Sequence, residues 1–186
     1  MYESFYGLKT KPFSMLPDPD FLYPGKKHQM ALTMLEYSLM NQAGFCVISG
    51  ETGAGKTTLL RKLLTNIDDD ITVGMITNTH QSFGELLDWI LSAYGIHEKG
   101  LSKVDMHQRF VDFLLEQYAN NKTTLLIIDE AQNMSVSVLE ELRMLSNLNS
   151  EKDQVLQVIL AGQPGLQLSL IHISEPTRPF TLSRMP

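Results

Sequence analysis

One short segment of the chain carries the glycines, the lysine and the hydroxyl group that together can hold a nucleoside triphosphate. Residues 50–57 read Gly-Glu-Thr-Gly-Ala-Gly-Lys-Thr and match the pattern G-x-x-x-x-G-K-[ST] in full. The three glycines are predicted to allow positive φ and close backbone approach, so that successive N–H groups point at phosphate oxygens. Lys56 would contact the β- and γ-phosphates, and the Thr57 hydroxyl would join the shell of a Mg²⁺ ion. The predicted nucleotide-binding residues are Gly50, Glu51, Thr52, Gly53, Ala54, Gly55, Lys56, Thr57 and Thr58.

Two consecutive acids follow an apolar run later in the chain. Residues 124–128 read Thr-Leu-Leu-Ile-Ile, and Asp129 and Glu130 come directly after them. Asp129 is predicted to complete the Mg²⁺ shell opposite Thr57, and Glu130 to polarise the water that attacks the γ-phosphate. An Asp-Glu pair favours a hydrolase of ATP over a kinase, and the chain has no Asn-Lys-x-Asp motif for reading guanine. We therefore predict ATP hydrolysis, with Lys56 and Glu130 as the catalytic residues.

Two polar residues at the ends of predicted strands could sense the γ-phosphate. Gln163 follows the predicted strand 155–161 and is either such a sensor or a plain residue of the turn Gly-Gln-Pro. Asn78 follows the predicted strand 73–77. It either holds Glu130 inactive until a partner binds or caps the following turn.

Side chains near the N-terminus could lie around the nucleoside. Phe5, Tyr6 and Phe13 either wall an adenine pocket or pack in the core. His28 is interpreted as a surface histidine in preference to a contact of the adenine or the ribose.

The apolar runs predict a sheet of mainly parallel strands with helices on both faces. Strand candidates are residues 45–49, 73–77, 124–128 and 155–161. Helix candidates are residues 27–41, 57–65, 83–94, 104–120 and 138–148. Strands that alternate with helices, and that are apolar almost throughout, are typical of a three-layer α/β sandwich. Ser137 and Glu140 are predicted to form a capping box at the start of the last helix. The fold predicted is that of a P-loop NTPase.

Composition limits the remaining classes of protein. The 186 residues are 43% hydrophobic and 19% charged, which suits one globular domain with a sizeable core. The formal net charge of −6 disfavours broad nucleic-acid binding. Cys46, the single cysteine, is interpreted as a buried structural thiol in a reducing compartment. We find no secretory signal and no apolar run long enough for a membrane span, and so predict a cytoplasmic location.

The domain organisation predicted has three parts. Residues 1–25 form a strap packed on the core, residues 26–167 form the nucleotide-binding core, and residues 168–186 are a non-native tail. The tail is predicted because residues 168–178 resemble the translated end of a transposase-tagmentation sequencing adapter. The alternative is a genuine short edge strand at residues 168–173.

The chain resembles the AAA+ ATPases of the general secretion pathway protein A (ExeA-like) family. The resemblance spans Met1 to about Leu166. It rests on residues 5–9, 11–13, 17–19, 21–23, 50–58, 128–133, 140–147 and 162–164. It implies an AAA+-type fold, a homo-oligomer, and an ATP-driven role in assembling a secretion or envelope-export system. Full-length relatives often carry a later membrane helix, which implies anchoring at the inner membrane. A more distant resemblance to transposition ATPases leaves a DNA-associated ATPase as the alternative, although nucleic acid is not the favoured partner.

The chain departs from this family after about residue 167. The family continues with another sheet strand, an arginine presented to the adjacent subunit, and a helical lid, and none of these is found here. We therefore expect a sheet incomplete at its C-terminal end, with the strand 45–49 exposed at an edge. Without the arginine, turnover by this fragment is expected to be weak.

Overall fold

The structure is a computed structural model that describes residues 2–8, 25–77, 79, 85–148, 154–166, 170 and 181–184. Its strands are β1 (Phe45–Ser49), β2 (Ile71–Ile76), β3 (Thr123–Ile128), β4 (Leu156–Gly162) and β5 (Thr181–Arg184). Its helices are α1 (Tyr2–Tyr6), α2 (Lys26–Met40), α3 (Lys56–Thr65), α4 (Leu86–Ala93), α5 (Lys103–Ala119) and α6 (Val136–Ser146). A single 3₁₀ turn, Ala131–Asn133, lies between β3 and α6. Alternating strands and helices confirm the α/β class.

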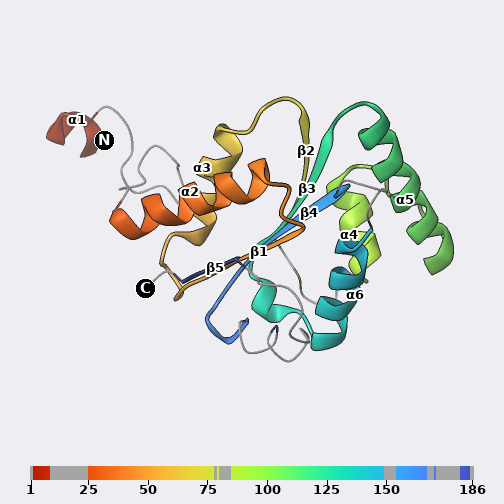
Figure 1. Cartoon of the computed structure of the whole chain (residues 1–186). Coiled ribbons are helices and arrows are strands. Elements are labelled where there is room, and N and C mark those ends of the chain that lie inside the picture. The colour runs from red at the N-terminus through yellow and green to blue at the C-terminus, as the bar shows by residue number, and fades with distance from the viewer. Residues whose placement is uncertain are drawn as a thin grey trace.

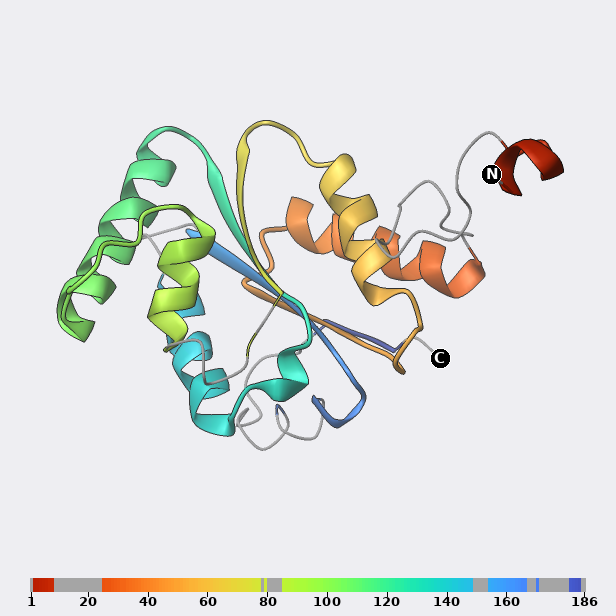
Figure 2. The same cartoon turned by 180° about the vertical axis from the view of Figure 1, so that it is seen from behind.

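The described strands form one parallel sheet in the order β2-β3-β4-β1-β5. Helices α2 and α3 cover one face, and α4, α5 and α6 cover the other (Figures 1 and 2). Because every strand is parallel to its neighbours, all strand carboxyl ends lie at the same edge of the sheet. This three-layer arrangement confirms the predicted sandwich.

Side chains of the central strands alternate between two separate cores. On β1, Cys46 and Ile48 pack towards α2 and α3, whereas Val47 packs towards α4, α5 and α6. Successive strand residues point to opposite faces, so a strand with helices on both sides must be apolar at nearly every position. Burial raises the pKa of the Cys46 thiol, as expected of a structural cysteine away from water.

Element boundaries agree with the predictions to within a few residues, and one cap differs. Helix α6 starts at Val136 because the Ser135 hydroxyl accepts a hydrogen bond from the backbone N–H of Val138. The predicted capping box of Ser137 and Glu140 is therefore wrong, since Ser137 already lies inside the helix. Ser135 and Ser137 are both suitable capping residues by type, and the direction in which the chain enters the helix places Ser135 at the cap.

The expectation of an open sheet edge at β1 is wrong. Strand β5 pairs with β1 in parallel, with Cys46 opposite Thr181 and Ser49 opposite Arg184. The pairing segment lies further along the tail than the edge strand considered at residues 168–173. Within that range only Leu170 is described, and it is helical and buried.

The described part of the N-terminal segment does not line a pocket. Phe5 is 81% exposed and Tyr6 70% exposed, with their rings in edge contact at 4.9 Å between centroids. Neither ring packs in the core or walls an adenine site, because α1 places both in solvent. Phe13 lies outside the described residues. Among the described helices, none is both long and apolar enough to cross a membrane.

Candidate nucleotide site

The described site residues come together because β1, β3 and β4 end at the same edge of the sheet. Ser49 at the end of β1 lies opposite Gly162 at the end of β4, and Ile128 of β3 lies opposite Leu160 of β4. The backbone N–H of Gly50 donates to the Gly162 carbonyl at 3.1 Å. Parallel α/β sheets bind ligands in the crevice beyond these carboxyl ends. The loop after β1 and the acids after β3 therefore face one common space.

The loop after β1 has the backbone shape that the glycine pattern predicts, except at its first position. Gly53 and Gly55 adopt φ values of +79° and +83°, which side-chain-bearing residues rarely adopt. Gly50 does not have positive φ, so that part of the prediction is wrong. Its N–H continues the ladder to β4, which requires an extended backbone. Directly after Gly55, helix α3 starts at Lys56 and turns its free N–H groups towards the loop.

Lys56 is a buried cation at the base of this loop. The residue is 5% exposed, and its ammonium donates to the carbonyls of Gly50 at 2.9 Å and Glu51 at 3.0 Å. An ammonium has three N–H donors, so one beyond these two can be directed at an anion. The lysine thus braces the loop and carries positive charge to the place where phosphates would lie.

Thr57 and Asp129 meet across the gap between α3 and β3. The Thr57 hydroxyl donates to Oδ2 of Asp129 at 2.5 Å, and Asp129 is 3% exposed. The other carboxylate oxygen, Oδ1, accepts from the backbone N–H of Glu130 at 2.9 Å. A hydroxyl and a carboxylate in contact are hard oxygen donors of the kind that Mg²⁺ takes alongside substrate phosphates. These two residues therefore fit the Mg²⁺ role predicted for them.

Glu130 has a strained backbone and a half-buried carboxylate. Its φ and ψ of 54° and 35° are left-handed, which costs a residue with a side chain about 1–3 kcal/mol. The buried Thr79 hydroxyl donates to the Glu130 carbonyl at 3.1 Å, and the Gln132 amide donates to Glu130 Oε2. Strain retained by several specific contacts is typical of functional positions.

The two predicted sensors differ in what the structure describes. Gln163 is exposed at the end of β4, and its backbone N–H donates to Gln132 Oε1 at 3.1 Å. Gln163 lies beside the loop after β1, and its sensor role stays a prediction. Asn78 lies outside the described residues.

His28 contacts the phosphate loop, which the sequence reasoning missed. Nε2 of this half-buried histidine lies 2.9 Å from the Ala54 carbonyl oxygen, so the hydrogen bond requires the proton on Nε2. His28 lies in the first turn of α2, and no local pattern links it to a loop 26 residues away. Gln132 and Thr79 were also missed as individual site residues, because their contacts depend on how three strand ends meet.

Replacing His28 by Ala is expected to weaken ATP binding about 2- to 10-fold, since one hydrogen bond that holds the loop is worth about 0.5–1.5 kcal/mol. Isothermal titration calorimetry with ATP and Mg²⁺ measures this change. His107→Ala, at an exposed histidine on α5, serves as the control. Equal affinity in His28→Ala and wild type would show that the loop keeps its shape without this contact.

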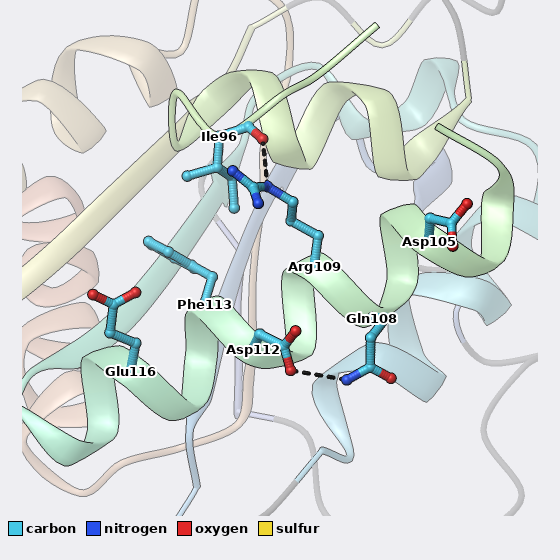
Figure 3. A pocket seen from close by; sticks show the side chains of 7 residues that line it. All are labelled: Ile96, Asp105, Gln108, Arg109, Asp112, Phe113 and Glu116. Carbon is cyan, nitrogen blue, oxygen red and sulfur yellow. Dashed lines mark hydrogen bonds between the residues drawn. The ribbon is translucent and has the colours of Figure 1, made fainter. Parts of the chain in front are cut away.

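A cavity elsewhere on the molecule is unsuited to nucleotide. It has a volume of about 300 Å³ and lies along α5, beside the connection from α4 (Figure 3). Its lining includes the acids Asp105, Asp112 and Glu116, whereas its cation Arg109 pairs with Glu98 at 2.6 Å. Three carboxylates would repel a triphosphate. The cavity along α5 is therefore not the candidate nucleotide site.

Comparison with known proteins identifies the family of the chain. A family model described as AAA domain matches residues 39–170. General secretion pathway protein A of Aeromonas hydrophila is 37% identical over 171 residues, which cover 91% of this chain and 31% of that protein. The chain thus spans less than a third of this relative's length.

Solved structures share the fold at low sequence identity. The Aeropyrum pernix ORC2 protein, in ADPNP–ADP complexes, superimposes with a TM-score of 0.64 at 19% identity, over 94% of this chain and 50% of that one. Cdc6p from Pyrobaculum aerophilum gives a TM-score of 0.63 at 17% identity, over 98% of this chain and 48% of that one. Because the family match covers most of the sheet and the whole phosphate loop, this chain belongs to the AAA domain family of P-loop ATPases.

Proposed function

We propose that this chain binds ATP with Mg²⁺ and hydrolyses it to ADP and phosphate, as the ATPase part of a longer protein that assembles a secretion or envelope-export system. The observation that carries the hydrolysis proposal is the convergence of Lys56, Thr57, Asp129 and Glu130 at one sheet edge. In particular, Thr57 and Asp129 make a 2.5 Å contact although they lie 72 residues apart.

Each residue has a distinct part in the proposed reaction. The loop N–H groups and Lys56 bind the β- and γ-phosphates and offset the charge that spreads over their oxygens. Thr57 and Asp129 would hold Mg²⁺, which neutralises phosphate charge when it is bound. Glu130 orients a water in line with the bond to the leaving phosphate oxygen and accepts its proton. Gln163 and Asn78 are proposed as γ-phosphate sensors.

The secretion role rests on the relative from Aeromonas hydrophila, whose name places it in the general secretion pathway. We propose that the ATPase works in the cytoplasm, where ATP is available, and that the longer protein is a homo-oligomer anchored at the inner membrane. Partners would be proteins of the export machinery. Turnover by this chain alone is expected to be weak if an adjacent subunit normally supplies an arginine, since that contribution reaches about 10³–10⁵-fold.

Release of inorganic phosphate tests the hydrolysis proposal. We expect release from ATP with Mg²⁺, little release after EDTA, and a slower rate with GTP. Absence of Mg²⁺-dependent release, both here and in the longer protein, would contradict it. Duplex DNA should leave the rate unchanged. Stimulation by DNA that falls steeply with salt would instead favour the DNA-associated alternative.

A further inference from the structure

One side chain joins the tips of two neighbouring strands beside the candidate nucleotide site. The amide nitrogen of Gln132 donates to Oε2 of Glu130, and its amide oxygen accepts from the backbone N–H of Gln163 at 3.1 Å. Glu130 follows β3 and Gln163 follows β4. The amide nitrogen of Gln132 therefore contacts the predicted base, Glu130, and its amide oxygen contacts the backbone of the predicted sensor, Gln163.

The backbone around Gln132 explains how it reaches both groups. After the left-handed Glu130, the 3₁₀ turn Ala131–Asn133 reverses the chain and brings Gln132 back beside the glutamate. Ala131 is fully buried and anchors this turn, while Thr79 holds the Glu130 carbonyl. With the glutamate's backbone held in this way, the orientation of its carboxylate depends on the side-chain contact from Gln132.

Gly162 leaves the space that Gln132 occupies. A Cβ at this position would lie 2.8 Å from Leu166 Cδ2, 2.9 Å from Gln132 Oε1 and 3.3 Å from the Gln132 backbone nitrogen. Side-chain carbons essentially never approach within 3.0 Å, so a larger residue at position 162 would displace both the Gln132 amide and the Leu166 side chain. The absence of a side chain at Gly162, the last residue of β4, thus leaves room for the Gln132 amide between the ends of β3 and β4.

We propose that Gln132 is a positioning residue that orients the Glu130 carboxylate for hydrolysis and makes that orientation depend on the β4 tip. A carboxylate held through Oε2 keeps its second oxygen for a water, whereas an unheld carboxylate rotates between several rotamers. Movement of the backbone at Gln163 would loosen the amide and turn the glutamate away. This inference rests on the hydrolysis proposed above.

Gln132→Ala tests the inference through steady-state ATP hydrolysis. We expect kcat to fall about 10- to 100-fold, because a misplaced base loses its near-attack geometry. The KM for ATP and the calorimetric ATP affinity should change less than about 2-fold, since the hydrogen bonds of Gln132 go to Glu130 and to the Gln163 backbone and not to the phosphate loop. Gly162→Ala should act in the same direction without removing a hydrogen-bonding group. Asn133→Ala, which removes an exposed amide from the same turn, serves as the control and should retain the wild-type kcat.

The outcomes separate this inference from the proposed function. If wild type hydrolyses ATP and Gln132→Ala has an unchanged kcat, the inference fails and the function stands. A fall in ATP affinity equal to the fall in kcat would mean a structural role and would also overturn it. If neither this chain nor the longer protein hydrolyses ATP, the function fails. The contact between Glu130 and Gln132 is then tested by a double-mutant cycle of Glu130→Ala and Gln132→Ala in thermal unfolding. Additive effects of the two substitutions on the free energy of unfolding would show that the side chains do not interact.

Discussion

Glu130→Gln is expected to lower the rate of ATP hydrolysis about 10²- to 10⁴-fold while leaving ATP binding within a few-fold of wild type. The substitution keeps the size and shape of the side chain, and its carbonyl oxygen can still accept from the Gln132 amide. A carboxamide has no basic oxygen, however, so it cannot take a proton from the attacking water. The loss should therefore appear in kcat and not in nucleotide affinity.

Phosphate release and calorimetry on the same preparation measure the two quantities together. Glu140→Gln, at an exposed glutamate on α6, makes the same chemical change away from the site and should retain wild-type turnover. Unchanged hydrolysis in Glu130→Gln would show that another group activates the water. If the variant also kept full biological activity in the longer protein, nucleotide would act there as a structural ligand, as in a scaffold that needs no hydrolysis.

Lys56→Ala is expected to weaken ATP binding by about 10- to 100-fold or more, because each hydrogen bond from a charged donor is worth about 1.5–3 kcal/mol. The same ammonium also satisfies the carbonyls of Gly50 and Glu51. Its removal leaves both acceptors without this donor, so the loop should lose shape as well as charge. We expect the free energy of unfolding to fall by about 1–3 kcal/mol without nucleotide.

Titration calorimetry and thermal unfolding, each with and without ATP, test both parts of this prediction. Wild type should be stabilised by ATP, whereas Lys56→Ala should show almost no shift at the same concentration. Lys62→Ala removes a lysine from the last turn of the same helix and serves as the control. Tight ATP binding by Lys56→Ala would contradict the assignment of the nucleotide site to the loop after β1.

Features encoded in short stretches of sequence could be predicted. The phosphate loop and the acids after β3 depend on a few neighbouring residues. The strand before the loop was predicted with its observed bounds, Phe45–Ser49. The sheet edge then brings loop and acids together, because parallel strands align their carboxyl ends. The sequence therefore sufficed for the fold class and for which residues the sheet edge brings together.

Features that depend on long-range contact could not be predicted. His28 has an ordinary helical setting in the sequence, and only the packing of α2 beside the phosphate loop places it against Ala54. Gln132 lies within a recognisable motif, yet its two contacts need the tips of β3 and β4 to be neighbours. Gly50 resembles the other loop glycines by type, and its pairing with β4 decides its backbone. The partner of β1 at the sheet edge depends on residues 181–184, whose composition gives no clear strand signal.

The strand order has a consequence for synthesis on the ribosome. Among the described strands, β1 pairs with β4 and β5, and both follow it by roughly a hundred residues or more. At about 5–20 residues per second, an apolar β1 waits roughly 5 to 20 seconds for its first partner to be made. During that interval its backbone N–H and C=O groups stay available to other chains. Nascent chains are therefore most open to misassembly, and most in need of chaperone binding, before β4 leaves the ribosome.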